Sequence, residues 1–417
     1  MKNHNFKQYD IWIVDPHGKC PWEKMGHLMG VKLAEHFASK QKRVLFITSN
    51  FSHILKEKRS DTTKYITGEY PYDLVLLKTN SYKNHVGFLR IIWHLNFTLS
   101  FLKEFKKWGN VEHISISHPL PFFENILSYV KKKTNSKVII YVRDLWPEIF
   151  KITLPKFLKK FDKLIFSFFY HSRSKSFLVA DGLSFVSKSY LHAIEKLENI
   201  SHKKTKVIYH AFLDKKNFLI ASDFKFTKGP ETKLILNYSG TLGSGYDLES
   251  LIEALKEIQK TIHANKIKLF VSGKGPNEEI IKAAEKELGK SIVEYLGILD
   301  YKDLMSLYRY TDVGCLPYVS ETTISFPAKV FDYIAVGKPV IHSIDGELRD
   351  LFDKNNCGIY FNAGNVDVLK NALLNLLEDD GKKLQKMSLN MRNISQNFTT
   401  EKTLENMYNF YIDVVSK

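Results

Sequence analysis

Residues 311–341 read TDVGCLPYVSETTISFPAKVFDYIAVGKPVI and contain an apolar run, a polar loop, a helical repeat and a second apolar run. The first run, Val313–Leu316, is typical of a buried strand in a parallel sheet. Pro327 suits the first turn of a helix, and Gly337 is typical of a helix end. This order of strand, loop, helix and strand predicts an α/β fold. Its loop would lie at the carboxyl edge of a sheet, where such folds bind ligands.

The same unit resembles the donor-sugar motif of retaining GT-B glycosyltransferases of the family-4 type, the glycosyl transferases group 1. In that family a strand ends in Leu-Pro, a loop carries a glutamate, and a helix carries a second carboxylate before the pattern A-x-G-x-P-V. Here Leu316-Pro317, Glu321, Asp332 and residues 335–340 occupy these places. Glu321 and Asp332 are further apart than the two family carboxylates. Residues 326–333, FPAKVFDY, are closer to a bacterial surface-polysaccharide subgroup in which P-S-K-x-x-E-Y is common.

The length of 417 residues indicates two domains, since one ordinary core does not extend over so long a chain. The resemblance implies a GT-B α/β architecture, with two Rossmann-like doubly wound domains facing a cleft. We expect an N-terminal acceptor-binding domain over residues 1–215 and a nucleotide-sugar-binding domain over residues 216–398. A C-terminal helix over residues 399–417 would return to the N-terminal domain.

The composition favours a cytoplasmic protein. No run of ~18 uncharged apolar residues is present, so we expect no membrane-spanning helix. The N-terminus lacks the apolar region of a signal peptide. Cys20, Cys315 and Cys357 are scattered without metal-ligand spacing, which suits a reducing compartment.

The net positive charge of the chain comes entirely from its first half. Residues 1–217 contain 37 Lys and Arg against 18 Asp and Glu, whereas residues 218–417 contain 24 against 27. In residues 154–178 lysines are interleaved with aromatic residues, which predicts a helix on an anionic membrane surface. Residues 88–108 predict another amphipathic helix, either core-packed or interfacial.

We therefore expect a peripheral protein on the inner face of the cell membrane, with a solvated basic face as the plain alternative. Nucleic acid is not expected as a partner, because no basic-region, zinc-ligand or RNP-type signature is present.

Two glycine loops follow apolar runs in the second half of the chain. The first, SGTLGSG at residues 239–245, joins a strand to a helix, a geometry that binds phosphate through backbone N–H groups. The second contains Gly273, Lys274 and Gly275. The resemblance implies donor binding here, although the family's arginine and lysine are replaced in the first loop by Thr241 and Ser244. Lys274 and Lys329 are therefore the candidate cations.

The resemblance implies a role for each candidate donor residue. Glycine-loop amides, with Lys274 or Lys329, would stabilise the leaving phosphate as it gains charge. Asp332 would accept hydrogen bonds from ribose hydroxyls, and Glu321 would grip the sugar as a catalytic-site residue. The complete donor-side set is Gly240, Thr241, Gly243, Gly273, Lys274, Gly275, Thr322, Thr323, Lys329 and Asp332.

Candidate residues in the first half follow the ends of expected strands. His118 follows the run His113–Ser117, and the resemblance implies that it faces acceptor and donor sugar as a catalytic residue. Residues 143–147 read RDLWP, in which Arg143, Asp144 and Trp146 offer a cation, a carboxylate and an aromatic face to an acceptor. Gly26 matches the family's first substrate loop. Each could instead be an ordinary loop residue.

These features lead to a retaining glycosyltransferase that moves a sugar from a nucleotide-sugar to a lipid-linked or glycan acceptor in surface-polysaccharide assembly. UDP-hexose or UDP-N-acetylhexosamine is the expected co-substrate. The missing loop cations leave a CMP-sugar open as the donor. No D-x-D motif is present, so no metal requirement and no further cofactor are expected. A sugar-nucleotide epimerase of the same architecture and an inactive scaffolding relative remain alternatives.

Overall fold

The computed structural model describes residues 8–23, 28–83, 87–211, 222–378 and 381–416. The chain divides into two compact units, with residues 1–209 and 403–417 in unit 1 and residues 210–402 in unit 2. The expected boundary at residue 215 lies outside the described residues. Within the described part of the chain, no helix combines the length and apolar character needed to cross a membrane.

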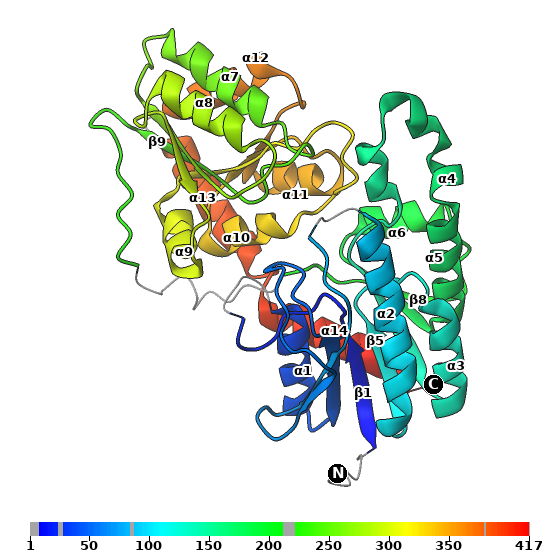
Figure 1. Cartoon of the computed structure of the whole chain (residues 1–417). Helices are drawn as coiled ribbons and strands as arrows, with labels where there is room; N and C mark the ends of the chain where they lie inside the picture. Colours follow the sequence, from blue (N-terminus) through cyan, green and yellow to red (C-terminus); the bar gives the residue numbers. More distant parts are fainter. Residues whose placement is uncertain (1–7, 24–27, 84–86, 212–221, 379–380, 417) are drawn as a thin grey trace. The chain divides into compact units, whose positions relative to one another are not determined.

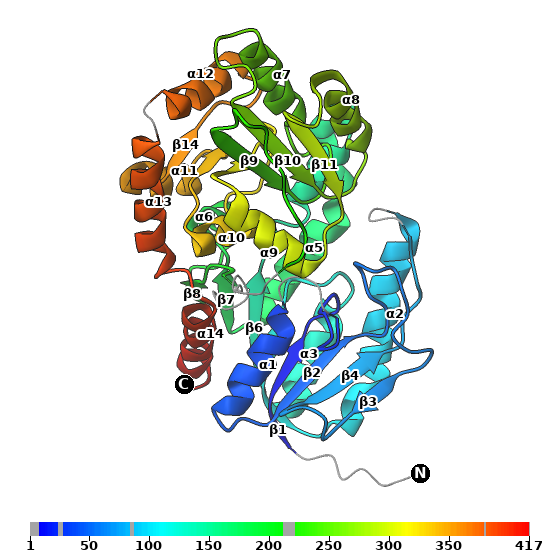
Figure 2. The same ribbon diagram turned by 90° about the vertical axis from the view of Figure 1, so that its left-hand side faces the viewer.

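Unit 1 is built on an eight-stranded sheet of order β3-β4-β2-β1-β5-β6-β7-β8 (Figures 1 and 2). All neighbouring strands are parallel except β3 and β4. Its strands are β1 (Tyr9–Val14), β2 (Val44–Ser49), β3 (Lys64–Ile66), β4 (Asp73–Leu77), β5 (Val111–Ile116), β6 (Lys137–Val142), β7 (Gly182–Phe185) and β8 (Lys204–Val207). The central strands are almost entirely buried, because helices cover both faces of the sheet.

Two helix layers cover the sheet of unit 1 (Figures 1 and 2). Helices α1 (Met29–Ser39) and α14 (Thr400–Val415) lie on one face, where Tyr411 packs against Phe37 and His113. Helices α2 (Phe88–Glu104), α3 (Glu124–Thr134) and α5 (Ser167–Val179) lie on the other, where Phe101 packs against Trp12. Successive strand residues point to opposite faces, which is why Trp12 meets a different layer from its neighbours. Shorter elements are η1 (Phe105–Lys107), η2 (Glu148–Thr153), η3 (Lys156–Phe161), α4 (Asp162–Ile165) and α6 (Lys188–Glu195).

Unit 2 is built on a six-stranded parallel sheet of order β11-β10-β9-β12-β13-β14. Its strands are β9 (Leu234–Ser239), β10 (Ile267–Ser272), β11 (Val293–Gly297), β12 (Val313–Leu316), β13 (Val340–His342) and β14 (Gly358–Tyr360). Its helices are α7 (Leu248–Gln259), α8 (Glu278–Leu288), α9 (Tyr301–Tyr310), α10 (Ala328–Val336), α11 (Glu347–Asn355), α12 (Val366–Leu377) and α13 (Lys382–Ser395).

The stretch 311–341 forms the strand, loop, helix and strand that its pattern predicts. Strand β12 spans Val313–Leu316, Pro327 precedes α10, and Gly337 ends that helix in the left-handed conformation. The expected single helix over residues 154–178 is wrong, because this segment divides into η3, α4 and α5. Part of α5 faces the core, where Arg173 and Phe177 are buried.

Each sheet contains a position where its strand order reverses. In unit 1 the chain proceeds from β1 to β2 on one side and later returns to β5 on the other. In unit 2 β9 has β10 on one side and β12 on the other. Loops diverge beyond the carboxyl ends of the strands at such a point and leave a crevice in which open α/β sheets bind ligands. Functional side chains are therefore expected at the carboxyl ends of β1 and β9.

Candidate functional site

The two glycine loops of unit 2 are packed against each other at the carboxyl ends of β9 and β10. Gly240 and Gly273 have φ angles of +146° and +138°, which L side chains rarely adopt. A Cβ atom on Gly273 would lie 1.7 Å from the carbonyl oxygen of Gly240. A Cβ atom on Gly275 would lie 2.4 Å from the carbonyl oxygen of Leu242. Only glycine permits this close approach, so the two loops form one backbone-lined surface.

Lys329 reaches this surface from the first turn of α10. Its Nζ donates a hydrogen bond of 3.2 Å to the hydroxyl of Tyr238, and it lies 4.2 Å from the ring centroid of Tyr246. A Cβ atom on Gly240 would come within 2.1 Å of the same Nζ, so the lysine occupies the space that this glycine leaves. Burial lowers the pKa of Lys329 to about 7, although the charge of Asp332 opposes the shift.

Asp332 lies one turn after Lys329 on α10 and is only 8% exposed. Its Oδ2 accepts a hydrogen bond of 3.1 Å from the hydroxyl of Tyr308 on α9. Burial and the neighbouring Asp332 carboxylate raise the pKa of Tyr308, so this phenol remains a donor. The carboxylate is thus held in one orientation by a residue that the sequence motif did not include.

The other donor-side candidates lie nearer the solvent. Thr241 is exposed, and its carbonyl oxygen accepts a hydrogen bond from the Tyr238 hydroxyl. Lys274 is exposed, while its carbonyl oxygen accepts from the backbone N–H of Leu242. The carbonyl oxygen of Gly243 accepts a hydrogen bond from the side-chain amide of Asn277. The structure therefore joins the two glycine loops to each other and to Lys329, but leaves the Lys274 side chain at the surface.

The loop after β12 carries Glu321, Thr322 and Thr323. Glu321 is exposed, and its Oε2 accepts a hydrogen bond of 3.0 Å from the Ser320 hydroxyl. The Thr322 hydroxyl accepts from the backbone N–H of Ile324, which closes a short turn. Thr323 is half-buried. These residues are placed on a surface turn and not on the helix that carries Lys329 and Asp332.

In unit 1, His118 follows the end of β5 and is 7% exposed. The Ser117 hydroxyl donates to Asp15 Oδ1 over 2.9 Å, so its oxygen is free to accept from His118 Nδ1 at 3.3 Å. These two hydrogen bonds assign the imidazole proton of His118 to Nδ1 and leave the lone pair of Nε2 available. Burial, followed by the charges of Arg143 and His94, lowers the pKa of His118 well below its usual value. The ring is therefore a neutral hydrogen-bond acceptor at physiological pH.

The acceptor-side candidates Arg143 and Trp146 lie beside His118. Arg143 Nη2 contacts Asp15 Oδ1 at 3.4 Å, and the Trp146 ring centroid lies 5.5 Å from that of His118. Asp144 is exposed at the carboxyl end of β6. Gly26 lies outside the described residues.

Sequence reasoning missed the residues that surround His118. The centroid of the His17 ring lies 4.4 Å from that of Trp93 and 5.8 Å from that of His118, and both pairs are stacked. The centroid of the His94 ring lies 5.6 Å from that of His17. His17 follows the end of β1, a position that could have marked it as a candidate. His94 and Trp93 belong to α2 and resemble ordinary core residues of an amphipathic helix.

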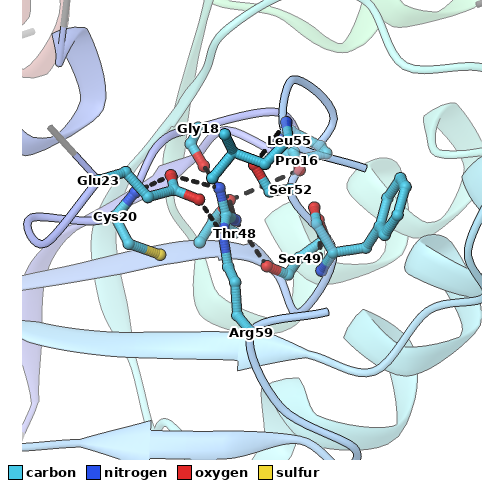
Figure 3. A network of polar contacts seen from close by, with 10 residues as sticks. Pro16, Gly18, Cys20, Glu23, Thr48, Ser49, Ser52, Leu55 and Arg59 are labelled. Atoms are coloured by element: carbon cyan, nitrogen blue, oxygen red, sulfur yellow. Dashed lines mark hydrogen bonds and ion pairs between the residues drawn. The ribbon is translucent and has the colours of Figure 1, made fainter. Parts of the chain in front are cut away.

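The loop that carries His17 is held by a buried ion pair (Figure 3). Arg59 Nη2 and Nε donate to the two carboxylate oxygens of Glu23 over 2.8 and 3.0 Å. The same guanidinium donates to the carbonyl oxygens of Ser49 and Gly18. Burial acts to raise the pKa of Glu23, but the hydrogen bonds and charge of Arg59 lower it overall. The pair thus fastens the loop after β1 to the end of β2.

No group of three or more His, Cys, Asp or Glu side chains among the described residues could hold a metal ion.

Comparisons with known proteins agree with this architecture. Residues 220–394 match the model of the family "Glycosyl transferases group 1". No curated protein matches the chain. Among solved structures, the sucrose-phosphate synthase tll1590 from Thermosynechococcus elongatus has a TM-score of 0.73 at 16% identity, covering 97% of this chain and 99% of its own.

Two further structures cover nearly the whole chain. Anabaena Alr3699/HepE in complex with UDP-glucose has a TM-score of 0.65 at 13% identity, with 97% of this chain and 99% of that chain covered. WaaG, a glycosyltransferase involved in lipopolysaccharide biosynthesis, has a TM-score of 0.66 at 13% identity, with 96% and 98% covered. The chain therefore has the GT-B fold of glycosyltransferases, and the group 1 family match within its second unit supports a transferase.

Proposed function

We propose that the protein is a retaining glycosyltransferase that uses UDP-hexose or UDP-N-acetylhexosamine and transfers the sugar to a lipid-linked or glycan acceptor. The observation that carries the proposal is the convergence of the Gly240 and Gly273 turns with Lys329 Nζ where the strand order of unit 2 reverses. The Gly240 and Gly273 N–H groups donate to the carbonyl oxygens of Ser272 and Gly297, so the ammonium and the remaining N–H groups of the two turns would face a phosphate ester. HepE, which shares the fold, is described in complex with UDP-glucose, which is consistent with this donor class.

The proposed chemistry needs charge stabilisation on the donor side. The bond between the sugar anomeric carbon and the donor phosphate oxygen breaks, and the acceptor oxygen bonds to that carbon from the same face. The acceptor proton passes to the departing phosphate, so no dedicated base is required. Lys329 and the loop amides would stabilise the negative charge that the leaving diphosphate gains. A single Lys329 ammonium in this position would replace the cations that Thr241 and Ser244 do not supply.

Asp332 and Glu321 would fix the rest of the donor. Asp332, oriented by the Tyr308 hydroxyl, would accept hydrogen bonds from the ribose. Glu321, with Thr322 and Thr323, would contact sugar hydroxyls from the surface turn after β12. His118 would accept a hydrogen bond from the sugar or the acceptor through the lone pair of Nε2.

A thermal-shift panel with UDP, GDP, CMP and ADP tests the donor assignment. A ligand that binds the folded form raises the melting temperature according to its affinity, so UDP should give the largest shift. A dominant shift with CMP would replace the UDP assignment by a CMP-sugar. No shift with any nucleotide would reject the proposal. Turnover of a UDP-sugar to an isomeric nucleotide-sugar, without an acceptor, would indicate an epimerase.

We also propose that unit 1 lies on an anionic membrane surface at the cytoplasmic face. Phe157 in η3 and Leu164 in α4 are 71% and 75% exposed, beside the exposed cations Lys156, Lys160 and Lys163. Exposed apolar side chains flanked by lysines suit shallow insertion between anionic headgroups. WaaG, named for lipopolysaccharide biosynthesis, is consistent with an acceptor of surface-polysaccharide assembly.

Helix α2 contributes a second exposed apolar face to unit 1. Its inner side buries Trp93, Phe97 and Phe101, whereas its outer side exposes Leu95 and Leu99. The sequence left core packing and an interfacial position open for this helix. The inner side is packed in the core, and we propose an interfacial position for the outer side. A bilayer would cover the outer side of α2, where Phe88, Leu89, Ile91 and Leu102 are also exposed.

A further inference from the structure

Unit 2 has an open cavity of about 540 Å³ beside the last strand of its sheet. Helix α11, all three residues of β14 and the first turns of α13 line it, and we name it the β14 cavity. Figure 2 shows these elements at the edge of the sheet opposite β11. The volume lies within the range of roughly 300–1,000 Å³ that is typical of small-molecule sites.

The β14 cavity is separate from the candidate donor site. Two strands, β12 and β13, lie between β14 and β9, so β14 is roughly 14 Å from β9 at a spacing of about 4.8 Å per strand. The cavity also includes Asn356 and Gly358, which precede and begin β14. The two glycine loops instead follow the carboxyl ends of β9 and β10. A ligand in the β14 cavity would therefore leave the donor site open.

The α11 wall of the cavity carries an arginine whose charge is already compensated. Arg349 Nη1 lies 3.2 Å from Asp345 Oδ1, and Arg349 Nε lies 3.4 Å from Asp353 Oδ2. The guanidinium carbon lies 4.0 Å from the centroid of the Tyr360 ring. Two carboxylates and an aromatic face thus hold the guanidinium in place, and it forms part of the wall.

The α13 wall carries two lysines, Lys383 and Lys386, and both are exposed. Asp353 is the one carboxylate among the described lining residues, and it pairs with Arg349. Even with Asp345 included, three cations face two carboxylates, so the cavity has a net positive charge. Residues three positions apart on a helix are neighbours, so the two ammonium groups can bind one phosphate group together.

The β14 wall offers backbone donors and acceptors. The Phe361 N–H donates to the carbonyl oxygen of His342 on β13, and strand residues alternate in direction. The N–H and C=O groups of Gly358 and Tyr360 therefore point away from β13, and no further strand of the described chain pairs with them. Such groups can bind the hydroxyls of a ligand, while the buried Met387 side chain adds an apolar contact.

These walls suit a small ligand better than a peptide strand. An added strand needs a long edge to pair with, but β14 has only three residues. In addition, the Asn390 side-chain amide on α13 donates over 3.1 Å to the carbonyl oxygen of Asn356 at the end of α11, which holds the two helical walls together. Paired lysines beside free backbone groups favour a compound that combines a phosphate with several hydroxyls.

We propose that the β14 cavity binds a sugar phosphate. Lys383 and Lys386 would bind the phosphate group, and the outer edge of β14 would bind the sugar hydroxyls. The proposal concerns unit 2 alone and does not depend on the transferase function. It gives the chain a second ligand site, at the opposite end of the strands from the glycine loops.

The test uses the full chain, labelled at the methionine methyl groups, with glucose 6-phosphate, mannose 6-phosphate and fructose 6-phosphate as probes. Met387 lines the cavity and is 6% exposed, so its methyl signal in NMR spectra reports binding, and Met387→Leu identifies that signal. At least one sugar phosphate should shift the signal saturably, whereas glucose should not. Inorganic phosphate should bind about tenfold or more weakly, because it lacks the sugar hydroxyls.

A double variant tests the role of the lysines. Lys383→Gln with Lys386→Gln keeps polar side chains on α13 but removes both charges, and should weaken sugar-phosphate binding about tenfold or more. The matched control is Lys286→Gln with Lys290→Gln, which removes two exposed lysines of unit 2 and should leave binding unchanged. UDP affinity should be the same in both double variants and the wild type. Failure of the wild type to bind UDP would reject the proposed transferase and leave sugar-phosphate binding as measured.

Four results would overturn the inference. No sugar phosphate shifts the Met387 signal up to high millimolar concentration, or the double variant of Lys383 and Lys386 binds as tightly as the wild type. Inorganic phosphate binds as tightly as the sugar phosphates, which would mean a general anion surface. Finally, the chain cosediments with phosphatidic acid vesicles and only the double variant of Lys383 and Lys386 loses this binding, which would assign the phosphate to a lipid headgroup.

Discussion

The ammonium of Lys329 lies 3.2 Å from the hydroxyl of Tyr238, although the two residues are 91 positions apart in the sequence. Tyr238 is the penultimate residue of β9 and Lys329 is the second residue of α10, so their contact brings the helix start to the glycine loop after β9. The Tyr238 hydroxyl in turn donates a hydrogen bond to the carbonyl oxygen of Thr241. The lysine is thus an oriented cation beside the glycine loop after β9, and UDP binding should depend on its charge.

Lys329→Met should weaken UDP binding. The substitution keeps the length of the side chain but removes a charge-assisted hydrogen bond, which contributes about 1.5–3 kcal/mol, or roughly tenfold to a hundredfold in affinity. Isothermal titration calorimetry measures this loss. Lys354→Met, in the last turn of α11, is the control and should bind UDP as the wild type does. Equal UDP affinity in Lys329→Met and the wild type would remove Lys329 from the donor site.

The pH dependence of UDP binding should also report Lys329. Its pKa is about 7 in the free protein because the side chain is buried, and an anionic ligand favours the charged form. Binding should therefore take up a proton near pH 7 to 8 and strengthen as the pH falls through this range. Calorimetry in buffers of different ionisation enthalpy measures proton uptake. Lys329→Met supplies the reference, since it retains the titration of UDP itself. Identical uptake in both proteins would contradict the assignment.

Glu23→Gln should destabilise unit 1 by about 3–5 kcal/mol, because it leaves the buried Arg59 guanidinium without its carboxylate partner. Urea unfolding followed by tryptophan fluorescence measures the change. Asp61→Asn, which removes an exposed partner of Lys58 in the same loop, should cost less than about 1 kcal/mol. If the two substitutions have similar effects, the Arg59–Glu23 pair does not hold the loop.

The free energy of unfolding should fall as the pH drops below about 6.5. Burial lowers the pKa of His94 and His113 to about 3 and that of His342 to about 4, so these rings stay neutral in the folded protein. The unfolded chain binds their protons near pH 6.5, which favours unfolding by about 1.4 kcal/mol per histidine and pH unit. Stability is thus retained above pH 6.5 and lost progressively down to about pH 3.

Urea unfolding at pH 7.5, 6.5 and 5.5 checks this dependence. Asp and Glu titrate mainly at lower pH, and Lys329 titrates near pH 7 in the folded protein, so the loss between pH 6.5 and 5.5 belongs mainly to histidine. His342→Phe should reduce the slope for unit 2. A constant free energy of unfolding between pH 7.5 and 5.5 would contradict the burial of these neutral rings.

Replacing the exposed apolar residues of η3 and α4 should weaken membrane binding. The double substitution Phe157→Ser and Leu164→Ser removes apolar area that would insert between headgroups, and should lower binding to vesicles containing anionic phospholipid about tenfold or more. Cosedimentation with anionic and zwitterionic vesicles measures this change. Ile262→Ser removes an equally exposed residue from unit 2 and should have no effect. Equal binding to both vesicle types would contradict the role of the lysines.

Local sequence was sufficient for the elements that carry the donor site. The run Val313–Leu316, Pro327 and Gly337 predicted a strand and a helix because apolar periodicity, a fixed proline φ and a left-handed glycine act within a few residues. Likewise His118 and Arg143 were placed at the ends of strands, where the α/β architecture puts its ligands.

Tertiary structure alone decided which side chains meet. Tyr308 donates to Asp332, and Arg59 donates to Glu23. The partners are 24 and 36 positions apart in the sequence, so no local pattern predicts either contact. His94 looked like a core residue of an amphipathic helix, and only the packing of α2 over the strand ends places it beside His17. The sequence by itself thus determined the elements and their polar ends, because these depend on neighbouring residues. The contacts of the sites required the fold, because they join residues from elements that are distant in the chain.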